Sequence, residues 1–164
     1  MILDILKAFI VGICNARQEL HITIAYFSPL KPFVDAIVRA WERGVQVTLI
    51  IPAQANFQND SNQQTVKNLL KKTNGGIQVY LSPKMLHTKL VMNETWISFG
   101  STNITKKAFA QLDEANLFLK NTDTPFRQTL LESIARDKED ARQVRDHREI
   151  RHRRLMAFLE GFLV

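Results

Sequence analysis

The sequence has very little cysteine. Cys14 is the one cysteine among 164 residues, so no disulfide can form within the chain. No group of cysteines and histidines has the spacing of a metal site, and we expect no bound metal. Cys14 itself lies in an apolar stretch with helical periodicity, which predicts a small buried side chain.

Long apolar runs are also absent. No apolar segment approaches the roughly 20 residues that span a bilayer. The apolar start of the chain contains Asp4 and Lys7 and lacks a basic leader and a small-residue cleavage site, so we expect no signal peptide. These features predict a cytoplasmic protein that is soluble or peripheral on the membrane.

Acidic residues are fewer than basic ones. The chain has 22 Lys and Arg against 16 Asp and Glu, which gives a formal net charge of +6 and a pI near 9.7. This balance favours an anionic partner, either nucleic acid or an acidic membrane surface, and does not choose between them. The hydrophobic fraction of 45% is enough to fill the core of one domain.

Helical and strand patterns alternate in the first half of the chain. Apolar residues have helical spacing over 2–17 and 33–43, and strand patterns occupy 21–27 and 45–51. A strand, a helix and a second strand at this spacing predict a βαβ unit with a parallel pair.

A polar loop is expected next, from residue 52 to residue 64. Ser61 and Gln64 have the spacing of a capping box, which predicts that a helix begins near Ser61. A further strand is expected at 77–81.

A hairpin is the central feature of the sequence. Residues 90–93 and 96–101 have strand patterns, and Asn93, Glu94 and Thr95 form the turn between them. The hairpin is followed by a short helix or turn and by a last strand over 114–119.

The open end of this hairpin collects residues that can handle phosphate. Alternate residues of a strand share a face, so His87 and Lys89 are expected to point the same way. The returning strand brings Gly100, Ser101 and Asn103 beside them. Glycine lets the backbone approach a ligand closely, serine and asparagine can donate hydrogen bonds to phosphate oxygens, lysine supplies charge, and histidine can act as a nucleophile or proton carrier.

These residues carry a resemblance to a known family. His87-Thr88-Lys89 followed by Gly100-Ser101-Thr102-Asn103 resembles the HKD signature of the phospholipase D superfamily, H-x-K-x-x-x-x-D-x-x-x-x-x-x-G-S-x-N. Flanking segments follow the order seen in the C-terminal half of bacterial cardiolipin synthases: Tyr26-Phe27-Ser28-Pro29, Arg43-Gly44-Val45-Gln46-Val47, Ile51-Pro52, Met85-Leu86 and Asp113-Glu114-Ala115-Asn116. The resemblance covers nearly the whole chain. It implies an α/β fold: an α/β/α sandwich with a mixed, mostly parallel central sheet, one half of a phospholipase D unit.

The sequence departs from the signature at two points. The aspartate is missing: counting forward from Lys89 gives Glu94, and counting back from Gly100 gives Asn93, because the interval is one residue short. The resemblance gives that aspartate a structural role, so we expect Asn93, Glu94 and Gly100 to shape the motif turn. The family active site also combines two motifs, and this chain has one.

The resemblance implies a role for each site residue. Lys89, Ser101 and Asn103 would bind the phosphate, and His87 would attack phosphorus through Nε2 to form a phosphohistidine. Glu114 would accept a hydrogen bond from Nδ1 of His87 and fix its tautomer, with the adjacent Asp113 as the alternative. A second histidine, acting as general acid, would come from a dimer mate or a partner chain with its own HKD motif. No metal or other cofactor is implied.

The end of the chain differs in composition from the rest. We expect residues 1–135 to form a phospholipase D-like domain that closes with a helix at 126–135, and 136–164 to form a basic, then apolar, helical tail. Residues 142–154 hold six arginines against two acids, and 155–164 are strongly apolar. The tail either docks on an anionic membrane surface or folds back onto the domain.

Three functions follow as hypotheses. The first is phosphatidyl transfer on a phospholipid substrate, as in a cardiolipin synthase. The second is a single-motif homodimeric phosphodiesterase or nuclease, with nucleic acid as the partner. The third is a catalytically inactive half-unit that keeps the fold.

Overall fold

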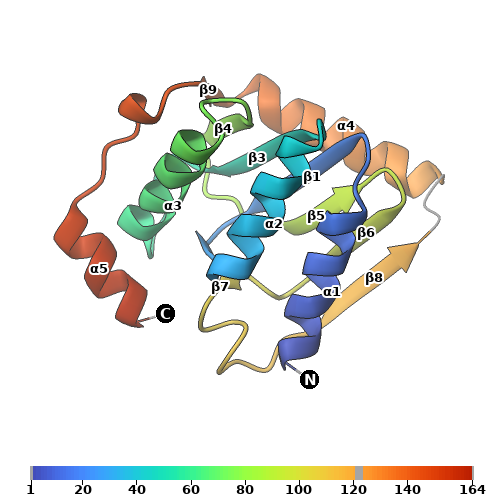
Figure 1. Cartoon of the computed structure of the whole chain (residues 1–164), viewed down its shortest axis with the longest axis horizontal. Helices are drawn as coiled ribbons and strands as arrows, with labels where there is room; N and C mark the ends of the chain where they lie inside the picture. The colour runs from blue at the N-terminus through green and yellow to red at the C-terminus, as the bar shows by residue number, and fades with distance from the viewer. Residues whose placement is uncertain (1, 121–123, 164) are drawn as a thin grey trace.

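A seven-stranded mixed sheet forms the centre of the molecule (Figure 1). The computed structural model describes residues 2–120 and 124–163. The strand order is β8-β6-β5-β1-β3-β4-β9, and a separate two-stranded sheet joins β2 and β7. The strands are β1 (Glu19–Ile24), β2 (Phe27–Ser28), β3 (Gln46–Pro52), β4 (Gln78–Ser82), β5 (Lys89–Asn93), β6 (Trp96–Gly100), β7 (Ile104–Thr105), β8 (Asn116–Lys120) and β9 (Arg142–Val144). The helices are α1 (Ile2–Asn15), α2 (Lys31–Glu42), α3 (Asn59–Lys72), α4 (Pro125–Glu139) and α5 (Arg154–Leu163), with a 3-10 turn η1 (His147–Glu149).

Parallel pairing is confined to the middle of the seven-stranded sheet. β1 and β3 are parallel, as are β3 and β4, which confirms the predicted βαβ unit. The pairs β1–β5, β5–β6, β6–β8 and β4–β9 are antiparallel. The mixed α/β sheet is therefore confirmed, but the expectation that it is mostly parallel is wrong. Short connections such as the β5–β6 turn can join only antiparallel neighbours.

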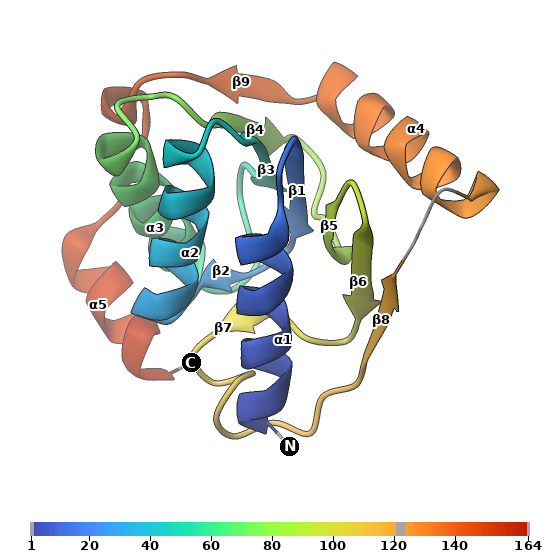
Figure 2. The same cartoon turned by 45° about the vertical axis from the view of Figure 1, so that its right-hand side comes forward.

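Helices cover both faces of the sheet, as two views of the molecule show (Figures 1 and 2). α1, α2 and α3 pack on one face, and α4 lies against the other. In β3, Leu49 and Ile51 belong to the core beneath the first three helices, whereas Ile50 packs with Ile134 of α4. The alternation of side chains along the strand thus builds the two cores of the expected α/β/α arrangement.

Phe9 of α1 is the centre of an aromatic cluster. Its ring meets those of Phe33, Trp96, Phe109 and Phe118 at centroid distances of 5.7 to 6.1 Å, all in edge-on geometry. Such pairs add about 0.5–1.5 kcal/mol each beyond the burial of their area. The cluster fixes α1 against the β6–β8 side of the sheet.

Cys14 is exposed, so the prediction of a buried thiol is wrong. The buried face of α1 is formed by Leu6, Phe9 and Ile13, and residue 14 lies outside this stripe. Its position follows from the helical repeat, because a neighbour of Ile13 turns about 100° away from the core.

α3 begins at Asn59, within the segment expected to be a loop. Ser61 and Gln64 lie inside the helix and do not form a capping box; the residue at the N-cap position is Gln58. The first turn is polar but buried, because its side chains bond to distant backbone: Asn62 donates to Ala25 O (2.9 Å) and accepts from Phe27 N (2.7 Å). The latter bond also holds Phe27 in β2, beyond the end of β1.

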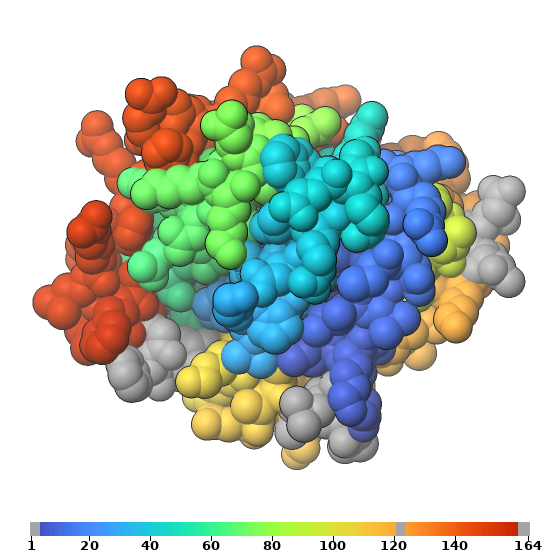
Figure 3. All heavy atoms as spheres, in the orientation of Figure 1, coloured from blue at the N-terminus to red at the C-terminus, as the bar shows by residue number. Residues whose placement is uncertain are grey.

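The C-terminal segment packs against the rest of the chain. β9 extends the sheet beside β4, so a strand lies where a helical tail was expected. Arg153 forms an ion pair with Asp60 of α3, in which two guanidinium nitrogens donate to Oδ2 (3.0 and 3.1 Å), and Ser61 N donates to Glu160 of α5 (2.7 Å). These bonds hold α5 against α3 at one end of the molecule (Figure 3).

Candidate functional site

The β5–β6 hairpin forms where the sequence predicts it. Leu90 pairs with Phe99 and Met92 with Ile97, so the turn lies at one end and Lys89 and Gly100 at the other. β5 also pairs with β1, and β6 with β8. The open end of the hairpin is therefore held on both sides by the sheet.

His87 and Lys89 meet at this open end. The Nζ of Lys89 lies 3.2 Å from Nδ1 of His87 and donates to the His87 carbonyl oxygen (3.0 Å). His87 is exposed, and Nε2 has no hydrogen-bond partner in the part of the chain that the structure describes. The histidine thus presents a free ring nitrogen beside a cationic side chain.

Lys89 is only partly exposed, and this affects its charge. Burial lowers the pKa of the Lys89 ammonium, and the nearby Glu114 carboxylate offsets part of that shift. Because an ammonium can only donate, Nδ1 of His87 accepts in this arrangement and the ring proton resides on Nε2.

Ser101 and Glu114 form the facing part of the site. The Ser101 hydroxyl donates to the Glu114 carboxylate and accepts from Ala115 N (3.1 Å). Within the described residues no hydrogen bond joins Glu114 to His87, so the expected orienting contact is not the one present here. The β6–β8 register pairs Gly100 with Asn116, and this places residues 114 and 115 opposite Ser101 instead.

Gly100 is required by the close approach of β8. A Cβ at this position would collide with the carbonyl oxygen of Ala115 and with the side chain of Asn116. Asn116 also donates to Ser98 Oγ (2.9 Å) and accepts from Thr102 N (3.2 Å). Asn116 therefore fixes the turn after β6, a role that the sequence alone did not reveal.

Asn103, the last motif residue, lines a cavity of about 680 Å³ whose lining does not include His87 or Lys89. It is half-buried, and its Oδ1 has no hydrogen-bond partner in the described chain. The structure thus brings His87, Lys89, Ser101 and Glu114 to one end of the hairpin and places Asn103 in an adjoining wall.

The hairpin and its motif residues lie within a segment that matches a known protein family. The family model described as "Cardiolipin synthase, PLD-like domain" matches residues 9–138, which is most of the chain. The chain belongs to the phospholipase D superfamily. The match includes the whole β5–β6 hairpin and all the motif residues described above.

The curated relatives of this chain include proteins that are named as cardiolipin synthases. Cardiolipin synthase B of Escherichia coli (strain K12) is 31% identical over 134 residues, which are 80% of this chain and 32% of the relative. The chain therefore spans about a third of the length of the curated relatives it matches.

Several solved structures share the fold, among them the following two. Nuc from Salmonella typhimurium, a phospholipase D family member, aligns with a TM-score of 0.74 at 19% identity and covers 86% of this chain and 91% of Nuc. Phosphatidylserine synthase from Haemophilus influenzae aligns with a TM-score of 0.77 at 14% identity and covers 98% of this chain and 41% of that one.

The closed end of the hairpin shows what replaces the motif aspartate. Asn93 is fully buried; its amide donates to Gly12 O (2.8 Å) and its oxygen accepts from Thr95 N (2.9 Å). The Arg127 guanidinium from α4 donates to Asn93 O (2.5 Å). Asn93 therefore anchors the hairpin turn to both α1 and α4.

Glu94 anchors the same turn to the start of β1. Its carboxylate accepts hydrogen bonds from the backbone N–H groups of Arg17 (2.7 Å), Gln18 and Glu19 (3.4 Å each). Burial by itself would raise the pKa of Glu94, but these N–H groups and its own hold it below the usual value. The two residues at the motif position thus share a structural role.

The described residues contain no cluster of three or more His, Cys, Asp or Glu side chains that could hold a metal ion. No helix in the ranges 2–120 and 124–163 is both long and apolar enough to cross a bilayer.

Proposed function

We propose that this protein transfers a phosphodiester group through a phosphohistidine on His87. The observation that carries the proposal is the exposed His87 ring, with an unbonded Nε2, beside Lys89 at the open end of the hairpin. Nε2 would attack phosphorus while the bond from phosphorus to the leaving oxygen breaks and that oxygen takes a proton from a general acid.

Lys89 has to move for this attack. With its ammonium on Nδ1, the histidine carries its proton on Nε2, which is the wrong tautomer for a nucleophile. A bound phosphodiester would draw the Lys89 ammonium onto its oxygens, because opposite charges attract strongly in a partly buried site. The released Nδ1 could then take the proton. Ser101 and Asn103 would stabilise the negative charge on the phosphoryl oxygens.

The general acid is proposed to be a histidine from a second HKD motif. This chain contains one motif, so the second would come from a dimer mate or a partner chain. A two-fold dimer would supply both histidines from one sequence. Nuc, a phospholipase D family member, supports this arrangement. The match covers 86% of this chain and 91% of Nuc, so the two chains have similar lengths.

Phosphatidyl transfer is the preferred reaction. It is supported by the relatives named for cardiolipin and phosphatidylserine synthesis. The exposed face of α5 gives further support, because Leu155, Phe158 and Leu159 are 71%, 61% and 45% exposed and Arg154 lies beside them. An apolar face next to arginines suits the surface of an anionic membrane.

Flotation on liposomes tests this membrane contact. The protein should float with vesicles that contain anionic phosphatidylglycerol, and Leu155→Glu with Phe158→Glu should reduce the bound fraction at least fivefold. Val11→Glu with Leu117→Glu is the matched control, since both side chains are 58% exposed and lie outside α5. Equal binding by both double variants would remove α5 from the proposal.

A homodimeric phosphodiesterase or nuclease is the second candidate. The similar length of Nuc favours it, together with the net charge of +6. Cleavage of DNA that weakens steeply with salt would support this alternative over phosphatidyl transfer. An inactive half-unit is the remaining possibility.

Light scattering combined with a turnover assay tests the proposal. Wild-type protein and His87→Ala would be compared for mass in solution and for hydrolysis of a generic phosphodiester. We expect a dimer whose turnover disappears in the variant. A monomer without turnover would contradict a self-contained site and direct the search to a partner chain.

A further inference from the structure

The basic residues near the C-terminus differ in whether they have acidic partners. In the segment around β9 and η1, Arg142 is paired with Glu149 (3.3 Å), and the Arg148 guanidinium is paired with Asp146. The positive charge of this part of the chain is therefore largely neutralised within the protein. The situation changes where the segment reaches α5.

Four basic side chains gather where α3 meets the start of α5, and we call them the junction cluster: Lys67, Lys71, His152 and Arg154. Lys67 and Lys71 are one helical turn apart and share a face of α3. The Nζ of Lys67 donates to Ile150 O (3.0 Å), two residues before His152, and this bond joins the two halves of the cluster. Within the ranges that the structure describes, none of the four side chains forms an ion pair with a carboxylate. The junction cluster therefore keeps its positive charge.

His152 lies among these charges. Its Nδ1 is buried and has no hydrogen-bond partner in the described chain. Burial lowers the pKa of the His152 ring, and the charges of Lys67, Arg154 and Lys71 lower it further. Asp60 opposes these shifts, but its carboxylate is already engaged in an ion pair within the protein. A bound anion would supply the negative charge that the junction cluster lacks.

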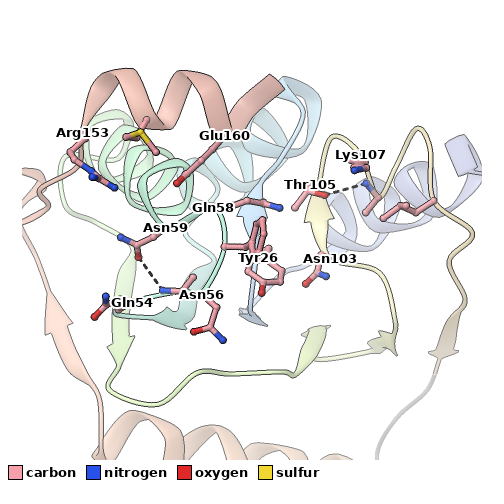
Figure 4. A pocket seen from close by; sticks show the side chains of 15 residues that line it. Tyr26, Gln54, Asn56, Gln58, Asn59, Asn103, Thr105, Lys107, Arg153 and Glu160 are labelled. Carbon is pink, nitrogen blue, oxygen red and sulfur yellow. Dashed lines mark hydrogen bonds between the residues drawn. The ribbon is translucent and has the colours of Figure 1, made fainter. Parts of the chain in front are cut away.

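The two sides of α5 differ in their surroundings. Arg153 and Glu160 border the cavity of about 680 Å³ (Figure 4). Leu155 and Phe158 are not part of its lining and are 71% and 61% exposed. Arg154 lies four residues before Phe158, so both share the exposed side of the helix. The junction cluster is therefore next to an exposed apolar face.

This combination matches the surface of an anionic bilayer. Phosphate groups lie there at the boundary above the acyl chains, so basic and apolar side chains of one helix are engaged together. Duplex DNA offers phosphates without an apolar layer and would leave the exposed face of α5 in water. α3 and α5 lie side by side at one end of the molecule (Figures 1 and 2), and no residue of the junction cluster belongs to the HKD motif.

We propose that the junction cluster binds the phosphate of an anionic phospholipid headgroup while the exposed face of α5 contacts the acyl layer. This inference rests on the membrane contact in the proposed function and names the group that is recognised and the residues that bind it. A lipid held here is a tether and not the reacting phosphodiester, because the cluster lies outside the motif at His87.

NMR of the histidine rings tests headgroup binding without a bilayer or turnover. Dihexanoylphosphatidylglycerol would be titrated into the protein below its micelle concentration while the ring C–H signals are followed, and His152→Gln identifies the signals of His152. We expect saturable shifts at His152. Zwitterionic dihexanoylphosphatidylcholine and inorganic phosphate should each bind at least about fivefold more weakly, since the first lacks the net charge and the second lacks the apolar chains. No shift at His152, phosphate binding as tight as that of the lipid, or shifts caused by a DNA duplex and not by the lipid would overturn the inference.

Two double variants locate the site. Lys71→Gln with Arg154→Gln removes two exposed charges from the junction cluster. Binding to phosphatidylglycerol vesicles should weaken at least about fivefold, because each basic residue near an anionic surface contributes to the affinity. Lys72→Gln with Arg148→Gln is the matched control, since it changes the net charge equally and both side chains pair with carboxylates within the protein. Equal binding by the two double variants would show general charge attraction only and overturn the inference.

The pH dependence of vesicle binding tests the part of His152. A phosphate beside the ring favours its protonated form, so the pKa of His152 rises on binding and binding takes up a proton. The affinity for phosphatidylglycerol vesicles should therefore increase about threefold to tenfold from about pH 7.5 to pH 5.5, while lysine and arginine keep their charge. His152→Gln should lose most of this increase, and His147→Gln, whose Nδ1 lies 3.3 Å from Asp146, should retain it. An increase that His152→Gln leaves intact would contradict the assignment of His152.

The two binding assays separate this inference from the proposed membrane contact. If wild-type protein does not bind the vesicles but the soluble lipid shifts His152, the membrane contact is contradicted and the headgroup site stands. If the vesicles are bound but the soluble lipid leaves His152 unchanged, the headgroup site is contradicted and the contact through α5 stands.

Discussion

The two ends of the β5–β6 hairpin differ in how their polar groups are used. At the closed end, Asn93 and Glu94 are bonded to backbone groups of α1, the α1–β1 connection and their own turn. At the open end, His87 is exposed and its Nε2 is unbonded among the described residues. One end of the same pair of strands therefore stabilises the fold, while the other leaves Nε2 of His87 available to a substrate.

This difference explains how the motif can lack its aspartate. The position is shared by Asn93, which bonds through its amide, and Glu94, which bonds through its carboxylate. Asn93 and Glu94 are six and seven residues from His87 along the chain, so the substitution changes the anchor of the turn and leaves the reactive end in place. The comparison predicts that variants at the two ends affect different properties.

The largest effect is expected from His87→Asn. Loss of the nucleophile should reduce phosphodiester turnover at least about 1,000-fold. The free energy of unfolding should change by no more than about 0.5 kcal/mol, because the side chain is exposed. Kinetics and urea denaturation measure the two properties; His147→Asn, far from the motif in sequence, is the control. A stability loss matching that of Asn93→Ala would erase the distinction between the ends.

Asn93→Ala should have the opposite profile. Removing the buried amide leaves Gly12 O and Thr95 N without partners, which should cost about 2–3 kcal/mol in the free energy of unfolding. Chemical denaturation measures this loss, with the exposed Asn68→Ala as control. A change below about 0.5 kcal/mol would show that the turn does not depend on Asn93.

Ser101→Ala tests the open end more finely. The hydroxyl bonds to Glu114 and Ala115 in the structure and is expected to turn to the phosphate during the reaction. Its loss should reduce turnover about tenfold to 100-fold, equivalent to about 1.4–3 kcal/mol of transition-state stabilisation. Thr95→Ala, at the closed end, serves as the control in the same assay. Unchanged turnover in Ser101→Ala would leave the serine with a structural role only.

Glu94→Gln should give the smallest effect, and one that depends on pH. At neutral pH the loss of the charged acceptor should cost about 1 kcal/mol in the free energy of unfolding. The pKa of Glu94 is lower in the folded protein than its ordinary value of 4.5, so its contribution is complete above that pH and declines as the pH falls through the folded pKa. The difference between wild type and variant should therefore shrink in acid. Exposed Glu139→Gln is the control; a difference that grows in acid would contradict this account.

Local patterns were sufficient to predict the hairpin and the βαβ unit. The alternation of side chains and the turn at Asn93 lie within a few residues of each other, so the sequence shows them directly. The start of α3 was missed because the residues that bury its polar first turn are remote: Asp60 pairs with Arg153, 93 residues away. The segment therefore resembled a solvated loop.

The sequence also could not show which hydrogen-bond partners the sheet register brings together. Glu114 was expected at His87, but its partner Ser101 follows from the pairing of Gly100 with Asn116. Likewise, the role of Arg127 depends on where α4 crosses the sheet. Composition predicted a basic C-terminal segment and could not show that β9 joins β4 or that α5 turns Leu155 and Phe158 outward.

Trapping the covalent intermediate is the most direct test of the central claim. Protein mixed with a phosphodiester donor would be quenched within milliseconds under alkaline conditions, which preserve phosphohistidine, and digested for mass spectrometry. We predict a phosphoryl adduct on the peptide containing His87 and none in His87→Asn. Turnover without an adduct at His87, or an adduct on another residue, would contradict the account.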